Sequence, residues 1–293
     1  QRRCGSEVFA SGVLPLSDAT SSARGQPAVE FTLSVVSHGH DAEVLALLGQ
    51  LAGMPAPQPR RVIVTDNRRE TALRAALRGR VYPFELVLVE NQAQAGFGAN
   101  HNRAFAKDQE LGASVLFAVV NPDLRLLGNP FPAMAFALGD LPNSGLSYPR
   151  QLDGQGRVQD AERRLPTPGR LWRRYLCPRQ DEVPAGTAPD WVNAACLLLR
   201  HEAYARIQGF DERYHMYCED VDLCLRMQLA GWRMVRADAL VEHAGRRASR
   251  RNLRHMAWHV ASLLRLWRSD AYRAFSRASH ARESAPWRQA ARR

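Results

Sequence analysis

Short apolar runs alternate with amphipathic segments over the first 120 residues of the chain. Four runs of strand length occupy residues 31–37, 61–65, 85–89 and 114–120. Helical spacing separates them: one segment begins at Asp41 and carries apolar residues from Val44 to Leu51, and others cover 69–79 and 98–107. Asp41 is a candidate helix cap, and Pro55 ends that helix. Continuously apolar strands that alternate with helices predict a mostly parallel α/β sheet flanked by helices on both faces.

Polar or glycine residues follow each of these four strands. The four ends are Ser37-His38-Gly39-His40, Asp66-Asn67, Glu90-Asn91 and Asn121-Pro122-Asp123. Ligands of parallel sheets bind at the carboxyl ends of the strands. The sequence therefore predicts that these four ends form one shared site.

The second half of the chain follows a different pattern. Residues 141–190 are rich in proline, glycine and charge, which predicts a loop-rich excursion with few long elements. Further elements are a buried strand over 191–199, a helix over 219–230 closed by Gly231, short strands at 233–235 and 240–242, and a last amphipathic helix over 252–267. We expect a flexible tail over 1–28, one domain over 29–249, and a basic helical C-terminal extension over 250–293. The domain divides into two halves, 29–125 and 126–249.

Positive charge is in excess and is concentrated near the C-terminus. The formal net charge is +11, and from Arg246 onward thirteen arginines stand against only Asp270 and Glu283. This balance implies an anionic partner, which is a phosphate-bearing substrate, an anionic membrane surface or a nucleic acid. No nucleic-acid reading motif accompanies the charge, so we expect no nucleic-acid partner.

Cysteine usage and hydropathy indicate a cytoplasmic protein. The five cysteines are odd in number and lack C-x-x-C spacing, which argues against a disulfide framework or a zinc finger. Cys196 and Cys224 are expected to be small core residues. No run of 18 apolar residues exists, and the apolar stretch from Val8 to Ala10 is too short for a signal peptide.

Three motifs of the first half suit a nucleotide-diphosphate ligand, and each also has a structural explanation. Asn121-Pro122-Asp123 can present a carboxylate to a divalent metal that bridges a diphosphate, but it is also good turn chemistry. The carboxylate of Asp66-Asn67 can accept from a base N–H, or can cap a turn. Gly96-Phe97-Gly98, followed by Asn100 and a helix, lets backbone approach a phosphate or ribose. It lacks the full dinucleotide-binding pattern.

Two motifs of the second half carry further chemistry. Glu219-Asp220 can supply a general base for an acceptor hydroxyl, although acids at a helix start are also favoured by the helix dipole. Asp222 and Arg226 have the spacing of a structural ion pair. His243, after a short strand, is either a metal ligand or a core histidine.

The stretch from Gly209 to Arg226, followed by Gly231-Trp232, closely resembles the hallmark segment of family 2 inverting glycosyltransferases. The resemblance is nearest to the bacterial rhamnosyltransferase-like branch, and it covers residues 31 to 249. Asn121-Pro122-Asp123 resembles that branch's version of the D-x-D metal motif. The motifs at Thr65-Asp66-Asn67, at 96–100, at Asp190-Trp191-Val192 and at His243 fall in the expected order.

The resemblance implies a GT-A fold, a nucleotide-diphosphate sugar donor, and Mg²⁺ or Mn²⁺ as cofactor. It makes 29–125 the nucleotide-sugar half of the domain and 126–249 the acceptor and catalytic half. It implies that Asp66 binds the base, that Asp123 and His243 hold the metal, and that Asp220 acts as catalytic base, with Glu219 as second choice. The expected nucleotide-sugar-binding residues are Ser37, His38, Asp66, Asn67, Gly96, Phe97, Gly98, Asn100, Asn121 and Asp123. Trp191 and Tyr217 are expected to stack on the acceptor.

Four positions depart from the family pattern. They are His38-Gly39-His40 after the first strand, Arg68-Arg69 after the Asp-Asn pair, Gln94 before the Gly-Phe pair, and Ala194-Ala195 in place of a Gly-Ala pair. These departures cluster around the nucleotide pocket, so they bear on the donor base and sugar more than on the reaction type.

The expected function is transfer of a sugar, with a rhamnose-like deoxysugar favoured, to a glycan or polyprenyl-diphosphate-linked acceptor in cell-surface polysaccharide biosynthesis. The C-terminal helix, with Trp258, Leu264 and Trp267 among arginines, fits an anionic membrane surface or an ordinary packed helix. The first alternative would place the enzyme at the inner face of the cytoplasmic membrane. A sugar-1-phosphate nucleotidyltransferase would need a glycine-rich basic loop after the first strand, which residues 37–40 do not supply. A non-enzymatic basic protein that binds nucleic acid or membrane is another alternative, but the excess charge lies mostly in the C-terminal tail and no nucleic-acid reading motif is present. An inactive family member that only binds is a third alternative, and the retained carboxylates argue against it.

Overall fold

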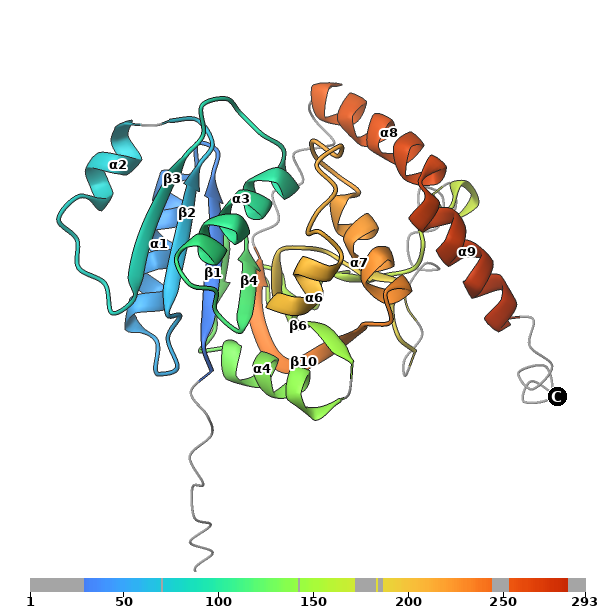
Figure 1. Cartoon of the computed structure of the whole chain (residues 1–293), viewed down its shortest axis with the longest axis horizontal. Helices are drawn as coiled ribbons and strands as arrows, with labels where there is room; N and C mark the ends of the chain where they lie inside the picture. The colour runs from blue at the N-terminus through green and yellow to red at the C-terminus, as the bar shows by residue number, and fades with distance from the viewer. Residues whose placement is uncertain are drawn as a thin grey trace, which may run out of the picture.

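The computed structural model describes residues 29–69, 71–141, 143–171, 183, 187–243 and 253–283. Its centre is an eight-stranded sheet with the order β3-β2-β1-β4-β9-β6-β10-β5 (Figure 1). The first four strands in sequence are β1 (Phe31–Ser37), β2 (Arg61–Asp66), β3 (Glu85–Glu90) and β4 (Leu116–Val120), and they pair in parallel. The parallel arrangement predicted from the apolar runs is confirmed. The predicted tail at 1–28 lies outside the described residues.

The other four strands extend this sheet with mixed directions. They are β5 (Leu124–Leu126), β6 (Ser144–Leu152), β9 (Cys196–Arg200) and β10 (Arg233–His243). Strand β9 runs antiparallel to both β4 and β6, β10 runs parallel to β6, and β5 runs antiparallel to β10. The result is an α/β fold whose sheet is parallel on one side and mixed on the other.

Two predictions for the second half are wrong, and a third did not foresee a long strand. The strand predicted over 191–199 is broken: β8 (Trp191–Val192) pairs with β7 (Glu162–Arg163) in a separate two-stranded sheet, and β9 begins only at Cys196. The break occurs at Asn193, whose side chain accepts from the Ala195 backbone N–H and pairs with Gln151. The excursion at 141–190 contains the nine-residue strand β6. The two short strands expected after Gly231 are one strand, β10, with an irregular register against β6 between Arg236 and Leu240.

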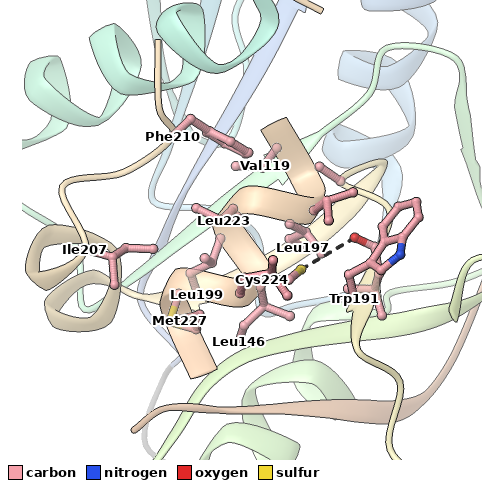
Figure 2. Packing of buried hydrophobic residues seen from close by; sticks show 14 of the residues in the cluster. Val119, Leu146, Trp191, Leu197, Leu199, Ile207, Phe210, Leu223, Cys224 and Met227 are labelled. Atoms are coloured by element: carbon pink, nitrogen blue, oxygen red, sulfur yellow. Dashed lines mark hydrogen bonds between the residues drawn. The ribbon is translucent and has the colours of Figure 1, made fainter. Parts of the chain in front are cut away.

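Hydrophobic cores lie on both faces of the main sheet. One face is covered by α1 (Asp41–Gly53), α2 (Thr71–Leu77) and α4 (Phe131–Asp140). The other face is covered by α3 (Phe97–Glu110), α6 (His201–Arg206) and α7 (Glu219–Leu229). Figure 2 shows the buried face of α7, where Leu223, Cys224 and Met227 meet side chains of the sheet. Cys196 and Cys224 are buried free thiols, as predicted.

Helix ends follow the sequence signals in part. Gly231 has φ +88° and follows the last turn of α7, with the Trp232 N–H bonded to the Met227 carbonyl, so the predicted closure is confirmed. The predicted cap at Asp41 is wrong. Asp41 is the first residue of α1, and its carboxylate accepts from the Ser37 hydroxyl rather than from a helix N–H.

The C-terminal helices are α8 (Leu253–Arg268) and α9 (Asp270–Glu283). They lie at the opposite end of the molecule from α2 (Figure 1). Leu263 and Leu266 of α8 and Phe275 of α9 are buried in the same core as α7. The indole N–H of Trp267 donates to the Pro166 carbonyl at 2.7 Å. The two helices are therefore packed onto the domain, and none of the described helices has the length and apolar content to cross a bilayer.

Candidate active site

The polar ends of the parallel strands lie side by side, as their sequence positions predicted. Ser37 at the end of β1 is in register with Asp66 of β2, and Asp66 is in register with Glu90 of β3. Strand β4 lies on the other side of β1 and ends immediately before Asn121. The backbone N–H of Asn121 donates to the Ala195 carbonyl at 2.8 Å, which joins this edge to the start of β9.

A hydrogen-bonded set of asparagines joins three of these ends to the start of α3. Asn91 donates to the side-chain oxygens of Asn67 at 2.7 Å and Asn100 at 2.5 Å. Asn67 also accepts from the Ala95 backbone N–H, and its amide lies 2.9 Å from His38 Nδ1. All three asparagines are buried. Such a satisfied polar network fixes the shape of the surrounding backbone. Asn91 was noted only as a strand-end residue, and its central position was missed.

Asp66 and His38, both predicted to bind the nucleotide sugar, lie beside these asparagines. Asp66 is buried, and its carboxylate accepts from the Arg68 backbone N–H at 3.0 Å. The pKa of His38 is lowered first by burial and then by the positive charges of Arg68, His40, His215 and Arg254. Arg254 belongs to α8, so the start of that helix reaches the charge environment of His38.

The two glycines at the start of α3 are required by close packing against the acceptor half. A Cβ at Gly96 would lie 2.6 Å from the backbone oxygen of His215, and a Cβ at Gly98 would lie 2.5 Å from Cβ of Phe210. The N–H of Phe97 donates to the same His215 oxygen at 3.0 Å. The Gly-Phe-Gly motif therefore joins the two halves of the site, a reason that the motif alone did not reveal.

Asp123 and His243, named from the sequence as metal ligands, lie together. Strands β5 and β10 pair antiparallel, with His243 opposite Leu124, and His243 Nε2 is 3.5 Å from Asp123 Oδ1. The Gln159 side chain holds the His243 carbonyl at 2.6 Å. Burial raises the pKa of Asp123, but the hydrogen bond and charge of His243 outweigh it, and that pKa lies below its ordinary value.

This pair fits a divalent metal as two protein ligands. Carboxylate oxygen and imidazole nitrogen are suitable donors for Mn²⁺, and their separation allows both atoms to touch one ion. The other ring nitrogen of His243 is buried without a hydrogen-bond partner among the described residues. The described residues contain no group of three or more His, Cys, Asp or Glu side chains that could hold a metal ion. Further ligands beside Asp123 and His243 would come from the donor and from water.

The predicted catalytic carboxylates form the first turn of α7. Glu219 is buried, and one of its carboxylate oxygens has no hydrogen-bond partner among the described residues. Burial, together with the neighbouring charge of Asp220, raises the pKa of Glu219 to about 8. Asp220 is only partly buried and accepts from the Val221 N–H at 2.8 Å. Burial raises the pKa of Asp220 as well, against the positive charge of Arg163. Because the charge of Asp220 is one cause of the raised pKa of Glu219, Glu219 is the acid of the pair that keeps its proton to the higher pH.

The backbone just before this pair is strained. Tyr217 and Cys218 have φ of +71° and +65°, in the left-handed region that residues with a side chain seldom adopt. Contacts from α8 surround this turn: Tyr217 Oη lies 2.9 Å from His255 Nδ1, and Ser262 donates to the Met216 carbonyl at 2.9 Å. Strained backbone of this kind is found at active sites and persists where surrounding contacts hold it. Nothing in the sequence linked α8 to this turn.

Trp191, expected to stack on the acceptor, is almost fully buried in the core. Its indole N–H donates to the Arg164 carbonyl at 2.8 Å, and the Arg163 guanidinium lies 4.9 Å from the centre of the ring. Tyr217 is partly exposed. Of the two residues predicted to contact the acceptor, Tyr217 is the more exposed to solvent. Trp191 contacts the guanidinium of Arg163, whose positive charge acts on Asp220. The ion pair predicted between Asp222 and Arg226 is confirmed at 2.7 Å.

Comparison with known proteins gives consistent sequence and structural relatives, although no family model matches the chain. An N-acetylglucosaminyl-diphospho-decaprenol L-rhamnosyltransferase of Mycobacterium tuberculosis is 29% identical over 227 residues, which are 70% of this chain and 73% of the relative. The rhamnosyltransferase WbbL of Escherichia coli is 37% identical over 90 residues, 29% of this chain and 33% of the relative.

Solved structures with the same fold are more distant in sequence. The mannosyltransferase PcManGT of Pyrobaculum calidifontis, in complex with GDP-Man and Mn²⁺, gives a TM-score of 0.53 at 16% identity, over 89% of this chain and 77% of its own. GalNAc-T7 with UDP, GalNAc and Mn²⁺ gives 0.55 at 9% identity, over 74% of this chain but only 44% of its own. The chain is therefore a glycosyltransferase with the GT-A fold, and its sequence is similar to those of rhamnosyltransferases.

Proposed function

We propose that this enzyme moves a rhamnose-like deoxysugar from a nucleotide-diphosphate donor to a sugar carried on a polyprenyl diphosphate. The sugar and the lipid-linked acceptor are those named for the M. tuberculosis relative. The reaction would belong to bacterial cell-surface polysaccharide biosynthesis and would take place where lipid-linked acceptors occur, at a membrane surface.

The observation that carries the donor side is the contact between Asp123 and His243. These residues come from distant parts of the chain, were named as metal ligands from the sequence, and lie 3.5 Å apart at the carboxyl edge of the sheet. A divalent metal bound there would stabilise the negative charge of the departing diphosphate. Asp66 and the asparagines behind it would receive the nucleoside, because ligands of such sheets bind at this edge.

The chain's own chemistry on the acceptor side is proton removal. Asp220, the more exposed of the two acids, takes the proton of the acceptor hydroxyl as its oxygen forms a bond to the anomeric carbon. The bond from that carbon to the diphosphate oxygen breaks, and its electron pair leaves with the nucleoside diphosphate. One displacement inverts the anomeric configuration. Glu219, with a pKa of about 8, stays mostly protonated at neutral pH, so the single charge of the pair rests on Asp220.

The test is metal-dependent donor binding. The protein is incubated with UDP-, GDP- and dTDP-sugars, including dTDP-L-rhamnose, with Mn²⁺, Mg²⁺ or EDTA, and Tm and slow donor hydrolysis are recorded. We expect one donor class to raise Tm by several degrees only with metal, because a ligand of the folded state stabilises it. Asp123→Ala and His243→Ala should each remove the metal-dependent part.

The matched control is Asp238→Ala, which removes an exposed carboxylate from the same strand as His243. It should respond to donor and metal as the parent does. If no donor changes Tm under any metal condition, the proposed function is wrong. If the Tm shift survives in both Asp123→Ala and His243→Ala, the metal assignment is wrong.

A further inference from the structure

The outward face of α8 is unusually apolar for an exposed surface. Met256, Val260 and Leu264 are spaced four residues apart, so they share one face of the helix, and they are 47%, 49% and 41% exposed. Ala257 and Ala261 are exposed beside them. No other helix or strand of the described residues exposes more than one large apolar side chain. We call this row of five residues the α8 stripe.

Arginines flank the α8 stripe. A hollow of about 500 Å³ beside its C-terminal half is lined by Arg213, Ala261, Leu264, Arg265, Arg268 and Ser269. Arg213 is paired with Asp211, whereas Arg265 and Arg268 form no ion pair with any carboxylate in the described part of the chain. The nearest acid in sequence, Asp270, is paired with Arg273. The hollow therefore combines positive charge with an apolar wall.

This combination identifies a chemistry. An apolar stripe suits the boundary of lipid acyl chains, and arginines beside it suit the phosphates of anionic headgroups. A nucleic acid would use the arginines but not the stripe. The longer stretches of the chain outside the described residues are poor candidates to cover this surface, because its arginines would repel a basic segment. Each of them carries more basic than acidic residues, and they are 1–28, 172–182, 244–252 and 284–293.

We propose that the α8 stripe and its arginine-lined hollow form the surface by which this enzyme docks on a bilayer containing anionic phospholipid. The apolar side chains enter the headgroup boundary, and Arg265 and Arg268 bind lipid phosphates. The inference deepens the proposed function and rests on it for its purpose, which is to bring the enzyme to a lipid-linked acceptor.

The inner face of α8 connects this surface to the catalytic turn. His255 and Ser262 hold Tyr217 and Met216, and Trp258 packs on His215 with ring centres 4.7 Å apart. Residues 215–217 lead directly into Glu219-Asp220 at the start of α7. A bilayer on the outer face of α8 therefore lies one helix away from the turn that carries the proposed base. An acceptor sugar could reach this base while its lipid stays in the membrane.

The test uses vesicle co-sedimentation of the full chain. Vesicles of phosphatidylcholine alone are compared with equimolar phosphatidylcholine and phosphatidylglycerol, at two salt concentrations. One variant removes the apolar contact, Val260→Asp with Leu264→Asp. Another reverses the charge, Arg265→Glu with Arg268→Glu. The controls are Val115→Asp with Phe136→Asp, and Arg78→Glu with Arg80→Glu, all exposed residues outside α8.

We expect the parent to bind only the anionic vesicles, less tightly as salt rises. Each α8 variant should lose at least about tenfold in binding. The Arg265/Arg268 variant loses two basic residues, each of which contributes about 1 kcal/mol at such a surface. The Val260/Leu264 variant replaces apolar contact with negative charge. The controls should bind as the parent does. Failure of the parent to bind anionic vesicles, or an equal loss in the controls, would overturn the proposal. So would a lipid-free dimer that the Val260/Leu264 variant abolishes, because the stripe would then be an interface between two copies.

Turnover separates this inference from the proposed function. On a water-soluble acceptor the α8 variants should match the parent, and on the same acceptor embedded in anionic vesicles they should be slower. If the parent turns over neither acceptor but the vesicle pattern holds, the proposed function fails and the docking surface stands. If turnover on embedded acceptor is unaffected in both α8 variants, the docking surface fails and the function stands.

Discussion

The half of the site that we propose binds the nucleotide is joined by hydrogen bonds. The half that we propose binds the acceptor holds a buried carboxylate oxygen without a partner among the described residues. On one side Asn67, Asn91 and Asn100 satisfy one another and the backbone around α3. On the other side Glu219 is buried beside Asp220, after two residues in left-handed backbone. The first arrangement stabilises a fixed shape. In the second arrangement, burial and the neighbouring charge disfavour ionisation of Glu219, and such an environment is how proteins raise the pKa of an acid.

The difference suggests a division of labour. A donor pocket must hold one nucleotide in one orientation, and a satisfied polar network does this at little cost in stability. A base must keep an accessible charge, and the burial that tunes its pKa opposes folding. Removing a polar group should therefore have different consequences in the two halves. Of the three variants below, one changes turnover, and the other two change the free energy of unfolding in opposite directions.

The largest effect is expected on turnover from Asp220→Asn. The amide cannot take the acceptor proton, so kcat should fall by about 10²- to 10⁴-fold, as expected for loss of a general base. Donor binding should be unchanged, because the change lies in the acceptor half. The measurement is kcat with saturating donor and acceptor, together with the Tm shift caused by donor and metal.

Asp238→Asn, an exposed change of the same type, is the control and should keep full activity. If Glu219→Gln abolishes turnover while Asp220→Asn does not, the base is Glu219. The acceptor half would then use its buried acid directly rather than as a protonated neighbour.

The same division explains how much of the molecule could be predicted from sequence. The parallel part of the sheet was predicted correctly, because β1 to β4 are separated by regular helices and each strand is a continuous apolar run. The site residues of this half followed from a geometric rule, since every parallel strand ends at the same edge. Ser37, Asp66 and Asn67 were therefore placed by position in the sequence alone.

The acceptor half depends on contacts that no local pattern records. The apolar run at 191–199 has strand composition throughout, but Asn193 bonds Gln151 and divides it between two sheets. Strand β6 is hidden in a segment rich in proline and glycine, because its neighbours β9 and β10 come from later in the chain. The contact between Tyr217 and His255 joins two segments whose separation carries no sequence signal.

A second prediction concerns the satisfied half. Asn91→Leu keeps the branching and the number of heavy atoms of the side chain but removes both of its donated hydrogen bonds, which leaves the buried Asn100 oxygen without this donor. We expect the free energy of unfolding to fall by about 2–3 kcal/mol, since an unsatisfied buried polar group costs more than a hydrogen bond contributes. Urea denaturation measures this change. The neighbouring Gln92 is exposed, and Gln92→Leu should leave stability nearly unchanged. An equal loss in both variants would mean that the network does not stabilise this half.

The third prediction reverses that sign in the acceptor half. The pKa of Glu219 is about 8 in the folded protein, above its ordinary value of 4.5, because burial and the charge of Asp220 disfavour ionisation. The protonated side chain therefore contributes stability that is fully present below pH 4.5 and is lost as the pH rises through 8. Glu219→Gln replaces it with a neutral group of the same shape. The variant should lie within about 1 kcal/mol of the parent near pH 5 and be more stable at pH 8.5 by about 4–5 kcal/mol, the free energy that corresponds to this difference in pKa.

Urea midpoints of the two proteins at pH 5 and pH 8.5 measure this difference. The control is Glu202→Gln on α6, where the carboxylate is exposed and its removal should change little at either pH. A variant that is less stable than the parent at pH 8.5 would mean that the charged Glu219 has a stabilising partner, and the contrast between the two halves would be lost. A gain that grows with pH, next to the loss in Asn91→Leu, would show that this enzyme stabilises its donor pocket and destabilises its acceptor pocket within one domain.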